Sequence, residues 1–490
     1  MSDDEVGENR LLIDGGLVPA EAGRTYPNVN PATEEVIGEV ADASADDVDR
    51  AVVAARRAFD ATAWSTDREL RRRCLEQLQA ALDKDRELLR REIIAEVGAP
   101  LLATYGPQLD FPLADAISHP LHAMDVFPWE RDLPAAEGPL GRSRRLVAKE
   151  PVGVVGAIVP WNFPLEITLH KLAQALATGN TVVVKPAPDT PWNATHLGRL
   201  IAEETEIPAG VVNIVTAADH ERGQQLVEDP RVDLISFTGS TATGRRIMAL
   251  GAPTLKRLFL ELGGKSAHVV LDDADFEAVL PATSFTCFHA GQGCAISTRL
   301  LLPRSRYEEG LAIVAESFAG VKVGDPNDPQ VLAGPLVNAT QRDRVLGYIA
   351  SGVDEGARLV CGGGRPESLD RGYYVEPTLF ADVDNGMRIA QEEIFGPVLV
   401  VIPFDDDDHA VTIANDSIYG LSGGVTSASE ERALGVARRI RTGTLSVNGG
   451  NWYAADSPFG GYKASGIGRQ GGIEGFEQYL ETKTIALPAG

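Results

Sequence analysis

The fold class is indicated by the stretch VGVVGAIVPWNFPLEITLHKLAQALATGNTVVVKPA (Val152–Ala187). It opens with an apolar run over 152–160, continues as a helical pattern from about Leu165, and ends with a second apolar run after Gly179. Short apolar runs bounded by glycine and proline are typical of buried strands. A strand, a helix and a strand in succession form one unit of a parallel sheet. The stretch therefore predicts an α/β fold with helices packed on a buried sheet.

The same alternation continues toward the carboxyl end of the chain. VVNIVTA (Val211–Ala217) and VDLISFTGS (Val232–Ser240) extend the first series, and a second series of strands and helices starts near Glu261. Within the first series, after the strand that ends at Ala187, Thr190 followed by Pro191 predicts a helix start, with the hydroxyl as cap and the proline at the first helical position. Two α/β units are therefore expected.

Size and charge restrict the possible partners. A chain of 490 residues exceeds what one hydrophobic core usually organises, and its formal net charge is -25. This charge disfavours nucleic acid and anionic membranes as partners. No apolar run approaches the roughly 20 residues of a membrane-spanning helix, and the start MSDDEVGENR lacks the basic lead of a signal peptide. A cytoplasmic protein is expected.

The cysteines indicate reactivity rather than metal binding. They lie at 74, 287, 294 and 361, without the paired short spacings of a zinc site, so no metal is expected. Cys294, in GQGCAISTR, follows a predicted helix and lies near Gly291 and Gly293, which would let backbone amides approach a bound atom. A thiolate there would attack a carbonyl and form a thioester, although a buried inert cysteine is the alternative. Cys287, two helical turns earlier, is expected to be buried filler.

Two further polar residues follow apolar runs. Glu261, in LELGGKS, precedes Gly263 and Gly264, which leave room beside its carboxylate. It is a candidate general base, or else a solvated acid at a strand end. Asn162, in PWNFP, is a candidate hydrogen-bond donor to an oxyanion, or else a turn residue.

A candidate phosphate site lies in FTGSTATG (Phe237–Gly244). This glycine-containing turn joins a predicted strand to a predicted helix, so a phosphate could rest on the helix N-terminus. The turn does not match GxGxxG. Lys185, at the end of another strand, could reach ribose hydroxyls or a 2′-phosphate, or could merely extend its ammonium to solvent.

Seven motifs taken together resemble the aldehyde dehydrogenase superfamily. They occur in the family's order over nearly the whole chain: PWNFP, KPA, FTGST, LELGGKS, GQGC, EEIFGPV and SPFGGYKASGIGR. The resemblance implies oxidation of a small-molecule aldehyde to a carboxylic acid, with NAD as cofactor.

The resemblance assigns roles by position. It makes Cys294 the nucleophile, Glu261 the general base, and Asn162 with the Cys294 backbone amide the oxyanion hole. Lys171 matches a lysine proposed to relay protons. The positions implied to hold the dinucleotide are Trp161, Lys185, Gly239, Ser240, Gly244, Leu262, Glu393 and Phe395, with Glu393 at the nicotinamide ribose. The positions implied to line the aldehyde tunnel are Phe163, Phe288 and Phe459.

The resemblance also implies a domain plan. A Rossmann-like dinucleotide-binding domain spans 1–127 and 152–260, and an α/β catalytic domain spans 261–465. A small β oligomerisation extension covers 128–151 and 476–490, where RSRRLVAKEPVG and YLETKTIALP read as strands outside both series. Such peripheral strands often pair between subunits, so a homo-oligomer, dimer or tetramer, is expected.

Two departures from the family pattern affect the cofactor and the base. Pro188, followed by Asp189, stands where many NAD-preferring members carry a glutamate that binds the adenosine ribose. Use of NADP therefore stays open. Gln470 stands where many relatives have a glutamate implicated in proton relay.

Three rival functions compete with aldehyde oxidation to the acid. A coenzyme A-acylating aldehyde dehydrogenase generally lacks the base at Glu261. A non-redox thiol esterase would not explain the nucleotide motifs, and no histidine partner is signalled near Cys294. A nucleotide-binding structural protein would be expected to have lost the nucleophile or the base.

Overall fold

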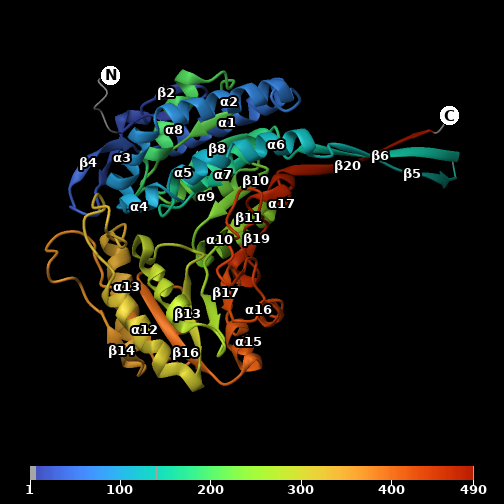
Figure 1. Ribbon diagram of the computed structural model, residues 1–490. Coiled ribbons are helices and arrows are strands. Elements are labelled where there is room, and N and C mark those ends of the chain that lie inside the picture. Colours follow the sequence, from blue (N-terminus) through green and yellow to red (C-terminus); the bar gives the residue numbers. More distant parts are fainter. Residues whose placement is uncertain (1–6, 140, 489–490) are drawn as a thin grey trace.

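The computed structural model of the protein describes residues 7–139 and 141–488 (Figure 1). Expectations for 1–6, 140 and 489–490, which include the acidic start and the last residues of the extension, lie outside the described residues. Two large sheets with helices around them form the body, so the predicted α/β fold class is confirmed. Within the described ranges, no helix is long and apolar enough to cross a membrane.

The first sheet contains the predicted strand, helix and strand. These are β7 (Val154–Ile158), α7 (Pro164–Ala177) and β8 (Thr181–Lys185), and the two strands are parallel. The sheet has eight strands in the order β19-β11-β10-β7-β8-β9-β1-β2. Its other strands are β1 (Leu11–Ile13), β2 (Gly16–Val18), β9 (Val212–Ile214), β10 (Leu234–Thr238), β11 (Arg257–Glu261) and β19 (Gly466–Ile467). The strands from β11 to β9 are parallel, and antiparallel strands complete both ends.

Helices cover both faces of this sheet because successive side chains of a strand point to opposite sides. Val182 and Val184 of β8 belong to one core cluster, whereas Val183 between them belongs to another. The first cluster includes residues of α2 (Arg68–Lys84), α7 and α8 (Trp192–Glu204), and the second includes residues of α1 (Ala45–Ala61). The remaining helices of this part are α3 (Arg86–Val97), α4 (Leu101–Thr104), α5 (Asp110–Asp115), α6 (Ser118–Val126), α9 (Glu221–Glu228) and α10 (Thr241–Gly251).

The second sheet has seven strands in the order β14-β15-β16-β13-β12-β17-β18, all parallel except β14. Its strands are β12 (Ser266–Val270), β13 (Ser297–Pro303), β14 (Arg358–Cys361), β15 (Thr378–Ala381), β16 (Val398–Phe404), β17 (Gly423–Thr426) and β18 (Ser446–Val447). Its helices are α11 (Phe276–Val279), α12 (Tyr307–Ala319), α13 (Ala339–Asp354), α14 (Arg388–Gln391), α15 (Asp407–Asn415) and α16 (Glu430–Ala437). Residues 262–265 link β11 to β12, so the carboxyl end of a first-sheet strand meets the amino end of a second-sheet strand.

A three-stranded sheet projects from the body as an arm (Figure 1). It consists of β5 (Glu130–Gly138), β6 (Gly141–Pro151) and β20 (Leu480–Pro488), antiparallel in the order β20-β6-β5. The helix α17 (Gly472–Glu477) precedes β20, and a separate hairpin pairs β3 (Thr25–Val29) with β4 (Val36–Ala41). The role of the arm in subunit contact stays a prediction.

The segment before Cys294 differs from the expected helix. After α11 the chain forms 3₁₀ turns over Leu280–Gly291, and His289 and Ala290 have φ values of 50° and 54°. The left-handed region interrupts a helix, so Cys287 is not two helical turns before Cys294. Cys287 is nevertheless fully buried, as expected.

Candidate active site

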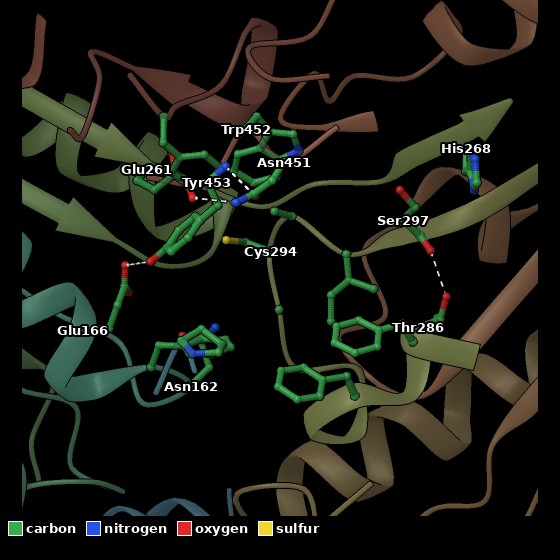
Figure 2. Close-up of a pocket in the computed structure, with 18 of the residues that line it drawn as sticks. Asn162, Glu166, Glu261, His268, Thr286, Cys294, Ser297, Asn451, Trp452 and Tyr453 are labelled. Carbon is green, nitrogen blue, oxygen red and sulfur yellow. Dashed lines mark hydrogen bonds between the residues drawn. The ribbon is translucent and has the colours of Figure 1, made fainter. Parts of the chain in front are cut away.

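A cavity of about 540 Å³ opens where the two sheets meet. Thr238 and Glu261 reach it from the carboxyl ends of β10 and β11, and Ser297 reaches it from the start of β13. Six predicted site residues line the cavity: Asn162, Phe163, Glu261, Phe288, Cys294 and Phe459. Figure 2 shows the Cys294 side of the cavity, with a separate group on the far side formed by His268, Thr286 and Ser297. The sequence motifs, far apart in the chain, therefore converge on one space.

Cys294 lies in the loop between the left-handed turn and β13. Its side chain is half-buried and lines the cavity. Burial raises the pKa of its thiol, and the carboxylates of Glu261 and Glu393 raise it further. The reason for the glycine at Gly291 differs from the one expected, because a Cβ there would lie 2.1 Å from the carbonyl oxygen of Gly396. Close backbone packing therefore requires this glycine.

Asn162 is held in the loop between β7 and α7. Its backbone carbonyl accepts from the Gln108 side chain at 2.7 Å and lies 3.0 Å from Nε2 of His289. Its Nδ2 donates to the carbonyl of Gln292 at 2.9 Å. An amide nitrogen carries two protons, so the second remains for a group in the cavity.

Glu261 ends β11 with a carboxyl group that is 2% exposed. Neither carboxylate oxygen has a hydrogen-bond partner among the described residues. Burial raises the pKa of Glu261 well above its ordinary value, while the ammonium of Lys171 acts in the opposite direction. A buried polar group without a partner is costly, so this placement favours a role with water or substrate.

Lys171 lies behind the cavity wall. Its Nζ donates to Oγ of Ser236 at 3.2 Å and lies 4.3 Å from the ring centroid of Phe259. Burial lowers the pKa of Lys171 to about 7, against the opposing effect of Glu261. Gln470 lines the cavity, and its Oε1 has no hydrogen-bond partner in residues 7–139 and 141–488, but the side chain carries no charge.

One group of the predicted dinucleotide residues lies at or beyond the carboxyl ends of β8, β10 and β11. Ser240 caps α10 by accepting from the backbone N–H of Thr243. A Cβ on Gly244 would lie 2.6 Å from Cδ1 of Leu262, so α10 packs closely on the segment after β11. Lys185 is buried, with Nζ 3.1 Å from the carbonyl of Pro186.

The other predicted dinucleotide residues lie near the link between the sheets. Oε1 of Glu393 accepts from the backbone N–H of Gly264 at 2.9 Å, and burial raises the pKa of this carboxyl. The rings of Trp161 and Phe395 meet edge to face at 5.3 Å. Phe395 has a φ of 62°, a left-handed conformation that is uncommon for a bulky residue and often marks a functional site.

One polar side chain of the cavity wall, Glu166, was missed by the sequence analysis, whereas Tyr453 lies in the segment NWYAAD (451–456), which was expected to shape the tunnel entrance. Glu166 of α7 accepts a hydrogen bond from the hydroxyl of Tyr453, and both line the cavity (Figure 2). A signal was present, because Glu166 and His170 are polar at a spacing of four in the mostly apolar helix α7. That spacing places residues on one face of a helix.

The described part of the chain contains no cluster of three or more metal-ligating side chains placed to hold a metal ion.

Comparison with known proteins gives consistent matches over nearly the full length. A sequence model described as the aldehyde dehydrogenase family matches residues 17–485. A 3-succinoylsemialdehyde-pyridine dehydrogenase of a Pseudomonas species is 44% identical over 483 residues, covering 97% of this chain and 98% of that protein.

Solved structures match equally well. A Mycobacterium tuberculosis aldehyde dehydrogenase complexed with NAD+ superposes with a TM-score of 0.94, at 43% identity over 99% of both chains. A mutant aldehyde dehydrogenase of Pseudomonas syringae, in complex with NAD+ and octanal, gives a TM-score of 0.92 at 39% identity, over 97% of this chain and 96% of that one.

Proposed function

The chain belongs to the aldehyde dehydrogenase family, and we propose that it oxidises an aldehyde to a carboxylic acid with NAD+ through a thioester on Cys294. The protein is therefore an NAD(P)-dependent aldehyde dehydrogenase, as the resemblance predicted. One observation carries the proposed mechanism. Cys294, Asn162 and the unpartnered carboxyl of Glu261 line the same cavity.

The proposed reaction begins with addition of the Cys294 thiolate to the carbonyl carbon. The free amide proton of Asn162 and the backbone N–H of Cys294 stabilise the resulting oxyanion, a contribution of about 2.7 to 4 kcal/mol in comparable sites. NAD+, when bound, would supply the acceptor for the hydride that leaves the former carbonyl carbon, so that the carbonyl re-forms as a thioester of Cys294. Glu261 then takes a proton from a water molecule as that water attacks the thioester carbon. The carbon–sulfur bond breaks, the acid leaves, and Cys294 returns to the thiolate.

The residues beyond β8 and β10 fit a dinucleotide. The capped N-terminus of α10 presents backbone N–H groups suited to a phosphate. Thr238 also has a buried Oγ1 without a partner in the described chain. Lys185 would hold the adenosine ribose and Glu393 the nicotinamide ribose.

The charges near Lys185 favour NAD+ over NADP+. Burial lowers the pKa of Lys185 to about 8, and the carboxylates of Asp219, Asp189 and Asp42 act against that effect. Three carboxylates around one ammonium would repel a 2′-phosphate. These carboxylates supply the repulsion of a 2′-phosphate that many NAD-preferring relatives obtain from a glutamate at the position of Pro188. We expect kcat/KM for NAD+ to exceed that for NADP+, and a preference for NADP+ would contradict this.

The rival functions are separated by one assay. We expect a panel of aldehydes to give reduced cofactor, detected by its absorbance, without coenzyme A. A strict requirement for coenzyme A would indicate the acylating reaction, and ester hydrolysis without reduced cofactor would indicate a thiol esterase. No reduced cofactor from any aldehyde would sink the proposal.

The nucleophile is tested by one variant and a matched control. Cys294→Ala should lose turnover while it still binds NAD+, whereas Cys361→Ala, which removes a thiol that does not line the cavity, should keep activity. Turnover by Cys294→Ala would contradict the thioester route.

A further inference from the structure

Glu166 places a carboxyl group in the wall of the aldehyde cavity. It lies in the first turn of α7, four residues after Asn162 in the chain, and is 5% exposed. One carboxyl oxygen accepts from the Tyr453 hydroxyl. The proposed chemistry at Cys294 uses neither residue. Burying an acid is costly, and the proposed reaction does not explain why this one lies in the cavity wall.

Tyr453 is fixed in place from two directions. Its backbone N–H donates to Oδ1 of Asn451 at 3.0 Å, and its hydroxyl donates to Glu166 on α7. Figure 2 shows Tyr453 reaching from its loop toward Glu166, with Cys294 close to the pair. The carboxyl group is thereby held at a fixed point of the cavity wall.

Several titratable groups act on Glu166, and they include further carboxyl groups. On its own helix they are Lys171 and His170, whose Nε2 lies 3.6 Å from a Glu166 oxygen. From other elements they are Tyr453, Asp115 of α5, Glu261 of β11 and the Cys294 thiol. Burial lowers the pKa of His170 to about 4, so this imidazole is neutral at physiological pH. The opposing cations are the Lys171 ammonium, which acts on Glu166 and Glu261, and the Arg469 guanidinium, which acts on Glu261. The Arg299 guanidinium also lines the cavity, but it donates to the backbone carbonyls of Lys265, Ile413 and Ala414.

Aromatic rings make up much of the remaining wall. Trp452 stacks on Phe459 with centroids 5.4 Å apart, and Phe288 stacks on Phe285 at 4.6 Å. Phe163 adds a further ring. Aromatic faces attract cations, and a carboxylate among them adds a direct charge interaction.

We infer that Glu166 is a specificity-determining residue that selects aldehydes bearing a cationic nitrogen over neutral aldehydes of the same shape. The inference rests on the proposed function, because it concerns the substrate of that same cavity. Tyr453 positions the carboxyl group, and the aromatic wall surrounds the cation. The same charge disfavours aldehydes that carry a second, anionic carboxylate.

The test uses pairs of aldehydes that differ in charge but not in shape. One pair is trimethylammonioacetaldehyde and its carbon isostere, tert-butylacetaldehyde, and a second pair has a spacer two methylenes longer. The quantity measured is the ratio of kcat/KM for the cation to that for the isostere. Glu166→Gln keeps the shape of the side chain and an acceptor for Tyr453. It should lower the ratio about tenfold for at least one pair.

Two variants serve as controls. Glu474→Gln removes an exposed carboxylate on α17 and should leave the ratio unchanged. Tyr453→Phe keeps the ring and the Glu166 carboxyl but removes a hydrogen bond that lowers the pKa of that carboxyl. The preference should therefore persist in this variant at high pH, about pH 9, where Glu166 is ionised. A loss of preference in Tyr453→Phe but not in Glu166→Gln would assign selection to the phenol and overturn the inference. If Glu166→Gln turns over both pairs with an unchanged ratio, the inference is also overturned. If the wild-type enzyme turns over no aldehyde, the proposed function is contradicted instead.

The pH dependence of the ratio gives a test in the unmodified enzyme. Burial raises the pKa of Glu166 to about 7. Loss of a proton from Glu166, or from Lys171, makes the cavity more negative, so the ratio should rise from about pH 6 to about pH 8. Ionisation of Cys294 or Glu261 would also add negative charge to the cavity, so the same pH series in Glu166→Gln isolates the part of the rise that belongs to Glu166. A ratio that is flat in the wild-type enzyme would contradict the inference even if Glu166→Gln does not fold.

Discussion

Among single residues, Glu261 is proposed to act only in the second half of the reaction, the hydrolysis of the thioester. Its carboxyl group has no hydrogen-bond partner in the described chain. If Glu261 activates water, Glu261→Gln should still form the thioester and release one equivalent of reduced cofactor. Turnover after that should be slower by roughly 100-fold or more, because general base catalysis contributes about 10² to 10⁴. Rapid-mixing measurement of the reduced cofactor gives both phases. Absence of both a burst and a trapped acyl-enzyme, in a variant that binds both substrates, would exclude a role in deacylation.

Lys171 tunes the same base through its charge. Its ammonium lowers the pKa of Glu261, against the dominant effect of burial, but its own pKa is only about 7. The ammonium therefore assists ionisation of Glu261 mainly below about pH 7 and loses that effect as pH rises. Lys171→Met should reduce kcat most at low pH, by roughly tenfold, and least above about pH 8. The pH profile of kcat checks this, and a deficit that is constant with pH would indicate a purely structural role.

The sequence predicted the residues that belong to motifs and missed one that does not. Cys294, Glu261 and Asn162 follow apolar runs and stand beside glycines or prolines, so each was recognisable from its neighbours. Glu166 lies within a helix whose other side chains are buried, and its polar spacing became meaningful only once the cavity beside it was known. Tyr453 reaches it from a loop far along the chain.

At the scale of elements, the start of α8 shows how a distant segment replaces a local cap. The expected cap at Thr190 is wrong, because its buried hydroxyl has no partner in the described chain and the helix begins at Trp192. The carboxylate of Glu96 on α3 instead accepts from the backbone N–H groups of Trp192 and Asn193 at 2.8 and 3.0 Å. A carboxylate satisfies the free donors of a helix N-terminus as a hydroxyl does. Local sequence signals carry no information about such a contact.

The same interface between α3 and α8 contains a buried histidine that should make stability depend on pH. His196 lies between Glu92, at 2.8 Å, and Asp85, at 3.0 Å, with Arg199 beside it. Burial lowers the pKa of His196, but the two carboxylates outweigh it and the net direction is upward. The folded state therefore favours the protonated ring, which stabilises the fold below the unfolded pKa of about 6.5 and stops doing so as pH rises through the folded pKa.

This effect predicts the behaviour of His196→Gln. The variant should lose on the order of 1 to 3 kcal/mol of stability at about pH 6 and less at about pH 9, since hydrogen bonds to charged groups are worth about that much. Thermal melts of both proteins at the two pH values measure the difference. A larger loss at the higher pH would reverse the assigned sign.

In the whole molecule, the two sheets could be predicted from the sequence, but the way in which they meet could not. The alternation of strands and helices predicted both sheets, because period-two and helical patterns are local. The meeting of the sheets at 262–265 depends on the direction in which β12 leaves β11, which no periodicity specifies. That junction brings Glu261 and Cys294 to one cavity.

The arm formed by β5, β6 and β20 extends away from the body and contacts it at the base, where Val147 and Ala148 of β6 are buried and Lys149 pairs with Glu477 of α17 (Figure 1). Nearly every residue of β20 is exposed, and Ile485 and Leu487 are 37% and 39% exposed. A small sheet whose faces are largely uncovered is marginally stable alone, and apolar side chains on such a sheet favour burial against another subunit. We therefore expect a homo-oligomer in which the arm of one subunit packs on another.

Replacing the apolar residues of the arm tests this assembly. Ile485→Asp combined with Leu487→Asp should shift the protein to a smaller species, because two carboxylates would be buried without partners in the contact. Light scattering coupled to size exclusion measures the mass directly. Val353→Asp, at an exposed position on α13, is the matched control and should leave the mass unchanged. A wild-type protein that is monomeric, or an oligomer indifferent to both arm substitutions, would show that the arm does not hold the subunits together.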